Sequence, residues 1–342
     1  MSETVIKLDN LSKKYGSFLA LNAVSFSIRR GEIIGLVGPN GAGKTTTLKL
    51  IARLIRPNSG SVFIKNIDCE LQNIHKNSKN LIEMGFLIDI PHFYNTTPYC
   101  LLRHIANIRN YPRNKIKLRI DHLLKTFDLY EWKYKKLKTF SKGMIQKLGF
   151  MVAIIHDPEL IILDEPQTGL DPNARIKIRE YLKSLQNEGK TILVSSHLLN
   201  ELREVCDKIA LMNQGVLIGF DTIDNLERDF KTKELICEIV NPIPIERVNN
   251  LIIKLIRQLE QFLVAKVDRS NFEDSITYNH QKNFFTICYD GKQTSRSEIL
   301  NILSKEFESD FTISSFYEPK SSQLESLYYQ MIKENNKKLK WD

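Results

Sequence analysis

The sequence predicts an α/β fold: a central, mostly parallel sheet around a phosphate-binding loop, followed by a small α+β domain. Three observations lead to this prediction. The apolar run Ile33–Val37 enters a glycine-rich loop and then a helical pattern. A second apolar run, from Glu159 to Pro166, lacks polar alternation and ends in two carboxylates, as expected of a central parallel strand. Phosphate-site motifs end before Phe230, and short strands and helices follow.

The glycine-rich loop has the spacing G-x-x-x-x-G-K-[ST], which is typical of a nucleotide triphosphate site. Its glycines allow backbone N–H groups to face an anion at a helix N-terminus. Lys44 is placed to reach the β- and γ-phosphates, and the Thr45 hydroxyl to complete the coordination of Mg²⁺. The loop does not follow G-x-G-x-x-G, so ATP is favoured over NAD. The expected nucleotide-binding residues are Gly38, Pro39, Asn40, Gly41, Ala42, Gly43, Lys44, Thr45 and Thr46.

Two acids follow the second apolar run, at the end of a strand where ligands bind in open α/β sheets. Asp164 is the expected metal partner. Glu165 is placed to orient or deprotonate the water that attacks the γ-phosphate. The alternative is a strand that merely ends in solvated acids.

Two further residues have a structural and a functional interpretation. His197 follows the buried strand Thr191–Val194 on the expected same edge, so a γ-phosphate contact is favoured over a purely structural role. Tyr15 lies in the polar stretch Ser12–Ser17, expected to be a turn between the strands Val5–Asp9 and Val24–Ile28. Its ring could pack half-buried or stack on the nucleotide base.

Composition limits the class of protein. The 342 residues are 42% hydrophobic and 26% charged, so we expect a substantial core and a division into two domains. We expect a cytosolic chain without membrane insertion, because no apolar stretch approaches the roughly 20 residues of a membrane span and the start lacks a signal-peptide core. The five cysteines, without a C-x-x-C pair, are expected to be reduced core residues.

The formal charge of +9 is concentrated in one segment. From Glu70 to Lys142 there are 14 Lys and Arg against 6 Asp and Glu. A solvated helical face explains this excess, and a surface for an acidic protein, anionic lipid or nucleic acid is the alternative. Strands are expected at Ser61–Ile64 and Gly85–Ile88, then helices from Pro98 to Trp132, interrupted at Pro112.

The last third has the predicted order strand, helix, strand, strand, helix, strand, which fits a ferredoxin-like unit. The apolar stripe of its first helix is expected to be core rather than a partner face. Ser295 with Glu298, and Ser322 with Glu325, fit capping boxes. The predicted elements are the strands 234–240, 264–267, 284–289 and 311–317, the helices 248–263 and 295–307, and a last helix carrying Leu324 to Met331.

Residues from Met1 to about Asp229 resemble the ATP-binding subunits of ABC transporters, with six separated motifs in the family's order. The resemblance implies an ABC ATPase domain at residues 1–229, with an antiparallel β edge and a helical subdomain at about 90–150, and an accessory domain at 230–342. It also implies adenine stacking by Tyr15, a Walker A loop at Gly38–Thr45, Walker B acids Asp164 and Glu165, and a switch histidine at His197. The stretch Gly169–Asp171 is similar to the D-loop.

Two motifs depart from the usual family pattern. Asp89 stands where the family usually has a glutamine; a carboxylate can still hold Mg²⁺ or accept from water, but it cannot donate an amide hydrogen bond. The signature segment is Phe140–Met144, with a helix expected after Ser141. It keeps Ser141 and Gly143, which by resemblance approach the γ-phosphate held by another subunit, and has Met144 in place of glutamine.

The two departures are similar to a branch that includes bacitracin-resistance and lantibiotic-immunity exporters. This implies an ATPase that uses ATP and Mg²⁺, pairs with a second ATPase subunit and powers a separate membrane permease from the cytoplasmic face of the membrane. The exported molecule would be a peptide antibiotic, drug or lipid-like compound, and nucleic acid is not expected as a partner. The alternatives are a soluble ABC ATPase acting on ribosomes or nucleic acid and a regulatory subunit with weak hydrolysis.

Overall fold

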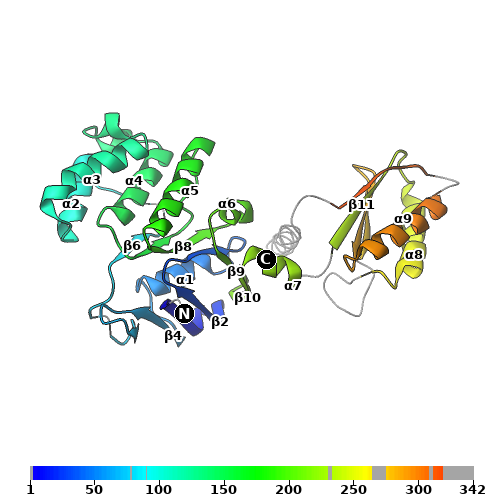
Figure 1. Cartoon of the computed structure of the whole chain (residues 1–342), viewed down its shortest axis with the longest axis horizontal. Coiled ribbons are helices and arrows are strands. Elements are labelled where there is room, and N and C mark those ends of the chain that lie inside the picture. The colour runs from blue at the N-terminus through cyan, green and yellow to red at the C-terminus, as the bar shows by residue number, and fades with distance from the viewer. Residues whose placement is uncertain are drawn as a thin grey trace. The chain divides into compact units, whose positions relative to one another are not determined.

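The computed structural model describes residues 3–77, 79–89, 91–229, 233–263, 275–307 and 311–318. The chain divides into two compact units, Met1–Ile223 and Asp224–Asp342, called unit 1 and unit 2 below (Figure 1). Each unit has a hydrophobic core of its own. The division lies slightly before the boundary at residue 229 that the sequence suggested.

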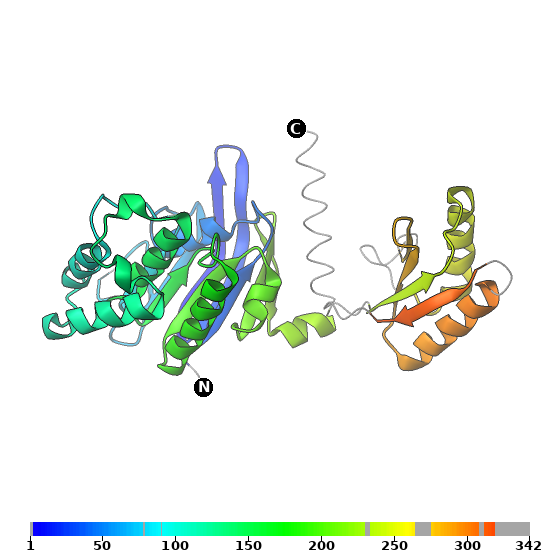
Figure 2. The same cartoon turned by 90° about the horizontal axis from the view of Figure 1, so that it is seen from above.

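Unit 1 contains an antiparallel sheet with the strand order β2-β1-β4-β5. Its first two strands form a long hairpin that extends as a two-stranded ribbon, shown in blue in Figure 2. Tyr15 pairs with Phe18 at the end of this ribbon. The strands are β1 (Thr4–Tyr15), β2 (Phe18–Arg29), β4 (Ser59–Lys65) and β5 (Leu71–Asn73).

The predicted polar turn over Ser12–Ser17 is wrong for most of its length. Ser12 to Tyr15 continue β1, and only the connection at Gly16, with φ of 58°, turns the chain. The end of the hairpin is exposed, so its side chains do not alternate between apolar and polar as those of a half-buried strand do. Its backbone groups still pair across the two strands. A prediction based on side-chain polarity therefore placed the ends of both strands wrongly.

The second sheet of unit 1 has the order β10-β9-β3-β8-β7-β6. From β9 to β6 the neighbours are parallel, and β10 is antiparallel to β9. The register places Val37 beside Ser196 and Leu163 beside Val194, so the carboxyl ends of β3, β7 and β8 meet at one edge. The strands are β3 (Ile33–Val37), β6 (Met84–Leu87), β7 (Leu160–Leu163), β8 (Thr191–Ser196), β9 (Lys208–Asn213) and β10 (Val216–Asp221).

Helices surround this sheet, and three of them, α2, α3 and α4, lie side by side (Figure 1). The predicted break at Pro112 separates α2 from α3. Ser141 caps α4, as the sequence suggested, by accepting a hydrogen bond from the Met144 N–H. The helices of this part are α1 (Lys44–Ile51), α2 (Pro98–Ile108), α3 (Arg113–Thr126), α4 (Lys142–Ile154), α5 (Pro172–Asn187) and α6 (Leu199–Arg203), with short 3₁₀ turns η1 (Tyr130–Trp132) and η2 (Leu137–Thr139). The helix α7 (Ile223–Asp229) begins at the last residue of unit 1 and continues into unit 2.

Among the described residues of unit 2, an antiparallel sheet has the strand order β12-β13-β11-β14, and the helices α8 and α9 connect its strands, which is the predicted ferredoxin-like topology. The stripe on its first helix is core: Val248, Leu255 and Leu259 are buried there, and the remaining members pack against the same cluster. The elements are β11 (Lys233–Ile239), α8 (Ile245–Leu259), β12 (Ile276–Asn279), β13 (Phe284–Tyr289), α9 (Gln293–Phe307) and β14 (Ile313–Tyr317).

Several details of unit 2 differ from the sequence prediction. The strand that follows α8 in the sheet is Ile276–Asn279, whereas the predicted strand at 264–267 lies outside the described residues. The capping box at Ser295 is wrong, because α9 already begins at Gln293 and the Ser295 hydroxyl donates to Asp290. The predicted last helix, with its capping box at Ser322, also lies outside the described residues.

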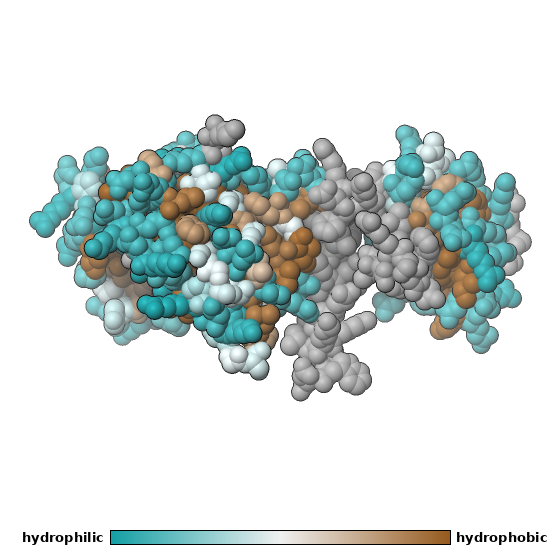
Figure 3. Space-filling model, turned by 90° about the horizontal axis from the view of Figure 1, so that it is seen from below, coloured by the Kyte–Doolittle hydropathy of each residue, from teal (hydrophilic) through white to brown (hydrophobic). Residues whose placement is uncertain are grey.

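The cysteines only partly match the expectation of core residues. Cys237 and Cys288 are buried and Cys206 is half-buried, but Cys69 and Cys100 are exposed. Over the described ranges, no helix combines the length and the apolar character that crossing a membrane requires. On the face drawn in Figure 3, hydrophilic and hydrophobic residues are interspersed over unit 1.

Candidate functional site

The phosphate loop lies between β3 and α1, at the edge where the strands of the parallel sheet end. Lys44 is the first residue of α1, and its Nζ donates to the carbonyl oxygens of Gly38 at 2.7 Å and Pro39 at 3.3 Å. The Lys44 ammonium therefore lies against the phosphate loop that precedes α1. Asn40 and Gly41 are exposed, and Thr46 is half-buried on the first turn of α1.

Two of the loop glycines are required by close backbone contacts. A Cβ at Gly38 would lie 2.4 Å from the Met212 carbonyl oxygen, and one at Gly43 would lie 2.8 Å from that of Ala20. Gly43 also has φ of 99°, which side-chain-bearing residues rarely adopt. Strands β9 and β2 thus fix the loop against the rest of unit 1. At Gly41, by contrast, a Cβ would meet no atom within 4 Å, so this turn of the loop is open.

Thr45 and Asp164 meet at the end of β7. The Thr45 Oγ1 hydroxyl donates to Asp164 Oδ2 at 2.7 Å, although 119 positions separate the two residues. Asp164 is buried, and its other oxygen accepts from the Ser195 hydroxyl at 2.5 Å. A hydroxyl and a carboxylate oxygen side by side are the kind of donors that suit Mg²⁺. Over the described residues, no cluster of three or more His, Cys, Asp and Glu suited to a metal is present.

Glu165 connects the loop with the end of β8. Its Oε1 lies 3.6 Å from Lys44 Nζ, and its Oε2 lies 2.8 Å from His197 Nδ1. The Glu165 side chain is 25% exposed and that of His197 is 44% exposed, so both can be approached from solvent. Lys44, Glu165 and His197 therefore lie together, as the sequence suggested from three separate segments.

The electrostatic environment of Lys44 is unusual. Burial lowers the pKa of the Lys44 ammonium below its ordinary value, because removal from water disfavours the charged form. The Glu165 and Asp164 carboxylates act in the opposite direction and only partly offset this. A phosphate group would supply further negative charge, so the site is better matched to an anionic ligand than to an empty state.

Two predicted residues occupy the margin of the site. Asp89, 59% exposed and with φ of 62°, pairs through Oδ2 with Lys49 Nζ of α1 at 2.7 Å. Its predicted metal role stays a prediction. Tyr15 is 47% exposed at the hairpin end, with Lys13 Nζ 5.3 Å from its ring centre. This exposure is compatible with both interpretations of the ring, and base stacking stays a prediction.

The signature segment lies at the start of α4. Ser141 is exposed, and a Cβ added at Gly143 would lie 3.2 Å from the Gly169 carbonyl oxygen. This segment therefore lies beside the Gly169–Asp171 turn, where Asp171 caps α5 by accepting from the Ala174 N–H at 2.9 Å. Within the described residues, Ser141 shares no hydrogen bond with the Lys44 and Thr45 cluster.

The sequence reasoning missed two residues. Ser195 is fully buried and joins both acids, because its hydroxyl donates to Asp164 and accepts from the Glu165 N–H at 3.0 Å. Gln146 is buried on α4 and donates through Nε2 to the Glu165 carbonyl oxygen at 3.1 Å. The available signal was a polar residue in an apolar context: Ser195 lies near the end of the apolar strand β8, and Gln146 shares a helical face with Phe150 and Ala153.

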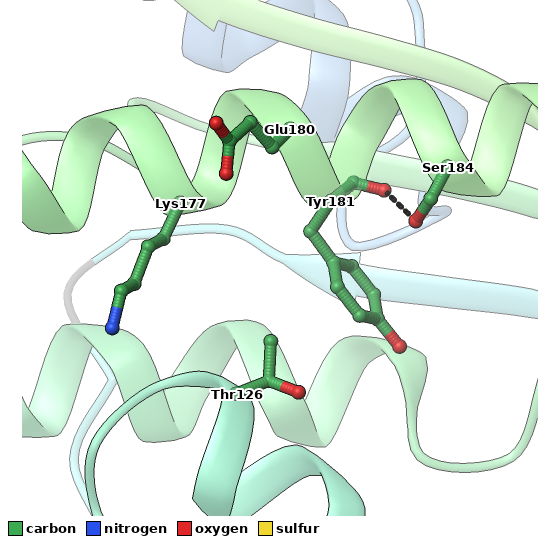
Figure 4. Close-up of a pocket in the computed structure, with 5 residues that line it drawn as sticks. All are labelled: Thr126, Lys177, Glu180, Tyr181 and Ser184. Atoms are coloured by element: carbon green, nitrogen blue, oxygen red, sulfur yellow. Dashed lines mark hydrogen bonds between the residues drawn. The ribbon is translucent and has the colours of Figure 1, made fainter.

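A separate hollow of about 330 Å³ lies between α3 and α5 (Figure 4). It is lined by Thr126, Lys177, Glu180, Tyr181 and Ser184, none of which is a predicted site residue. Lys177 pairs with Asp128 at 2.5 Å, and the Ser184 hydroxyl donates to the Tyr181 carbonyl oxygen at 2.8 Å. This hollow is therefore a surface depression apart from the phosphate loop.

Known proteins match the part of the chain that contains the phosphate loop. The family described as ABC transporter matches residues 21–168. The chain is 38% identical over 228 residues to the bacitracin transport ATP-binding protein BcrA of Enterococcus faecalis, covering 66% of this chain and 72% of that protein. The chain belongs to the ATP-binding subunits of ABC transporters. As an ABC ATP-binding subunit, it binds ATP and hydrolyses it to drive transport.

Other relatives support this membership. The lantibiotic transport ATP-binding protein SrtF of Streptococcus pyogenes is 33% identical over 235 residues, which is 68% of this ABC subunit and 98% of that protein. A solved ATP-binding subunit of an ABC transporter has 30% identity and a TM-score of 0.61, covering 66% of this chain and 93% of that one. The ABC ATPase fold and the enzymatic class predicted from the sequence are thereby confirmed.

Proposed function

We propose that Glu165 is the general base of ATP hydrolysis and that Lys44 and His197 hold the γ-phosphate beside it. The observation that carries this proposal is the convergence of three segments: Glu165 lies within 3.6 Å of Lys44 Nζ and 2.8 Å of His197 Nδ1. A carboxylate in this position can accept a proton from a water aimed at the phosphorus. His197 keeps the carboxylate oriented, and Lys44 stabilises charge on the phosphate oxygens.

The proposed metal ion is Mg²⁺, held by the Thr45 hydroxyl and Asp164, with Asp89 as a further ligand directly or through water. When bound, the ion would supply positive charge that offsets the negative charge developing on the phosphate oxygens. The 2.7 Å hydrogen bond between Thr45 and Asp164 supports the assignment of these two residues as ligands, because it shows that their oxygens lie close enough to share one ion. Ser195 fixes the remaining Asp164 oxygen and so sets the direction of the carboxylate.

The proposed active form contains two ATPase subunits, most simply two copies of this chain. Ser141 and Gly143 of one subunit would complete the phosphate site of the other. Their position supports this: Ser141 is exposed at the start of α4, beside the Gly169 turn, and is not bonded to the Lys44 and Thr45 cluster among the described residues. Each chain then supplies one half of each site, ATP closes the pair, and hydrolysis reopens it.

The proposed partner is a membrane permease in a separate chain, with this subunit at the cytoplasmic face of the membrane. The relatives named for bacitracin and lantibiotic transport favour a peptide antibiotic, drug or lipid-like compound as the exported molecule. Asp89, paired with Lys49 on α1, is the residue through which we expect movement of the phosphate site to reach the permease.

The substitution Glu165→Gln tests the assignment of the base. We expect ATP affinity to stay within about twofold and hydrolysis to fall by about 10²- to 10⁴-fold. Size-exclusion chromatography with ATP should then show a persistent dimer. Glu159→Gln is the matched control, because Glu159 precedes the same strand but pairs with Arg30 at the protein surface. Turnover of E165Q close to that of the unchanged protein would refute the assignment.

A further inference from the structure

The backbone of Glu165 is held in an uncommon conformation by groups from two other elements. Its φ of 47° lies in the left-handed region, which residues with side chains seldom occupy. The Glu165 N–H donates to the buried Ser195 hydroxyl of β8 at 3.0 Å. The Glu165 carbonyl oxygen accepts from the Thr168 N–H at 3.1 Å and from Gln146 Nε2 at 3.1 Å. Such a conformation persists only where its surroundings determine it.

Gln146 lies on α4, the helix that also begins with the signature segment. Gln146 is 5% exposed and lies five positions after Ser141, which caps the same helix. A helix rises about 1.5 Å per residue, so roughly 7 Å of rigid backbone separates the two positions. A displacement of the start of α4 is therefore transmitted to the side chain of Gln146.

We propose that Gln146 is a positioning residue that couples the signature segment at the start of α4 to Glu165 of the same chain. This inference rests on the proposed function, in which Ser141 and Gly143 contact the ATP held by the partner subunit. Engagement of that ATP fixes α4, and Gln146 then fixes the backbone of the chain's own base. Occupancy of one site thereby sets the geometry of the other.

The hydrogen bond from Gln146 to the Glu165 carbonyl oxygen can be tested with two substitutions. Gln146→Met keeps the length of the side chain but removes the donor, and Gln146→Glu keeps the shape but places an acceptor against the Glu165 carbonyl oxygen. We expect kcat to fall about 10- to 100-fold in both variants, with KM for ATP nearly unchanged. The melting temperature should stay nearly unchanged in Q146M and fall in Q146E, which buries an unpaired carboxylate. Ile145→Met, a control that places the same residue one position earlier on α4, should keep its kcat. An unchanged kcat in Q146M would overturn the proposal.

Mixed dimers separate this role from simple support of α4. Two differently tagged chains are purified as dimers, and single-turnover hydrolysis is measured so that the two sites need not cycle together. One dimer pairs a Q146M/E165Q chain with an unchanged chain, and the other pairs a Q146M chain with an E165Q chain. If Gln146 acts on Glu165 of its own chain, the first dimer cleaves about one ATP at the rate of an unchanged site, and the second dimer cleaves its ATP about 10- to 100-fold more slowly.

The opposite result overturns the proposal. If Gln146 only supported the signature segment, its loss would damage the partner's site, so the first dimer would be the slow one and the second would cleave about one ATP at the rate of an unchanged site. An E165Q homodimer serves as the reference for the proposed function itself. If that homodimer hydrolysed ATP normally, the base assignment would fail whatever the Gln146 variants did, so the two failures are distinguishable.

Discussion

The sheets of the two units place polar side chains in different ways. In the parallel sheet of unit 1, β3, β7 and β8 all end at one edge, and Lys44, Glu165 and His197 follow these three ends. In unit 2 neighbouring strands run in opposite directions, so their polar groups pair locally across the sheet. Glu238, for example, accepts from the Ser315 hydroxyl at 2.5 Å and the Tyr317 hydroxyl at 2.9 Å.

This difference explains why one unit has a candidate site and the other does not among its described residues. Parallel strands collect the side chains that follow them, and their loops can then share one ligand. The hydrogen bonds to Glu238 instead hold neighbouring strands together, and that from Ser315 lowers the pKa of its carboxyl most, followed by that from Tyr317. Polar residues are thus used for chemistry in unit 1 and for strand pairing in unit 2.

Among the changes that test this comparison, Lys44→Ala has the largest expected effect, because it removes the lysine of the phosphate loop in unit 1. We expect kcat for ATP to fall by about 10²- to 10³-fold, as on loss of a group that stabilises transition-state charge. Lys133→Ala is the matched control, because both lysines are 6% exposed. Steady-state hydrolysis of both variants makes the comparison.

The control lysine has a structural environment. Lys133 pairs with Asp121 and lies over the rings of Tyr99, Tyr130 and Tyr134. Burial acts to lower its pKa, but the hydrogen bonds to Asp121 and Tyr134 raise it overall, unlike that of Lys44. We expect K133A to lose stability and keep the kcat of the folded protein. Equal losses of kcat in K133A and K44A would contradict the distinction.

The next effect concerns unit 2 alone. Phe285 is fully buried and packs against Phe307 and Tyr278, with ring centres 5.7 and 4.8 Å away. Phe285→Ala should reduce the free energy of unfolding of unit 2 by about 3–5 kcal/mol, because it leaves a cavity. Differential scanning calorimetry should show one transition shifted to lower temperature.

If unit 2 serves assembly and not hydrolysis, F285A should leave the KM for ATP unchanged below that transition. Phe18→Ala is the control in unit 1, because Phe18 is 61% exposed and its loss should change stability by no more than about 0.5 kcal/mol. A calorimetric transition of unit 1 that shifted as much as that of unit 2 would show that the two cores unfold together.

The smallest effect is a dependence of stability on pH in unit 1. Burial lowers the pKa of His156 below its ordinary value, partly opposed by the hydrogen bond to the Met84 carbonyl oxygen. Its Nδ1 has no partner among the described residues. The unfolded chain therefore binds a proton more readily below about pH 6.5, and stability should fall by up to about 1 kcal/mol between pH 7 and pH 5.

His156→Gln should reduce this loss in urea unfolding curves measured at the two pH values. Some of the loss should remain, because burial also lowers the pKa of His75. The exposed His122, substituted in the same way, is the control and should leave the pH dependence unchanged. A full pH dependence in H156Q would assign the effect to other groups.

The candidate site was largely predictable because its signals are local. The spacing around Lys44, the acids after an apolar strand and the histidine after another strand are each visible within a few residues, and a parallel sheet brings them together. Ser195 and Gln146 were missed because their roles depend on which distant backbone group they face. No spacing in the sequence contains that information.

The fold was predictable in its order of elements and less so at their ends. The hairpin was longer than expected because its far end, at Tyr15 and Phe18, is exposed and shows no burial pattern. In unit 2 the strand β12 was not predicted, because Ile276–Asn279 carries few apolar residues. Both errors arise where backbone pairing, and not side-chain burial, decides the structure.

The uneven exposure of the cysteines makes this protein suitable for site-directed spectroscopy without prior mutagenesis. Cys69 and Cys100 are open to thiol reagents, and they lie on the antiparallel sheet side and on α2 of unit 1, respectively. Burial raises the pKa of Cys206 and brings that of Cys237 to about 12, which disfavours the reactive thiolate. A pair of fluorophores attached to the two open thiols would report how the helical segment moves when nucleotide is added.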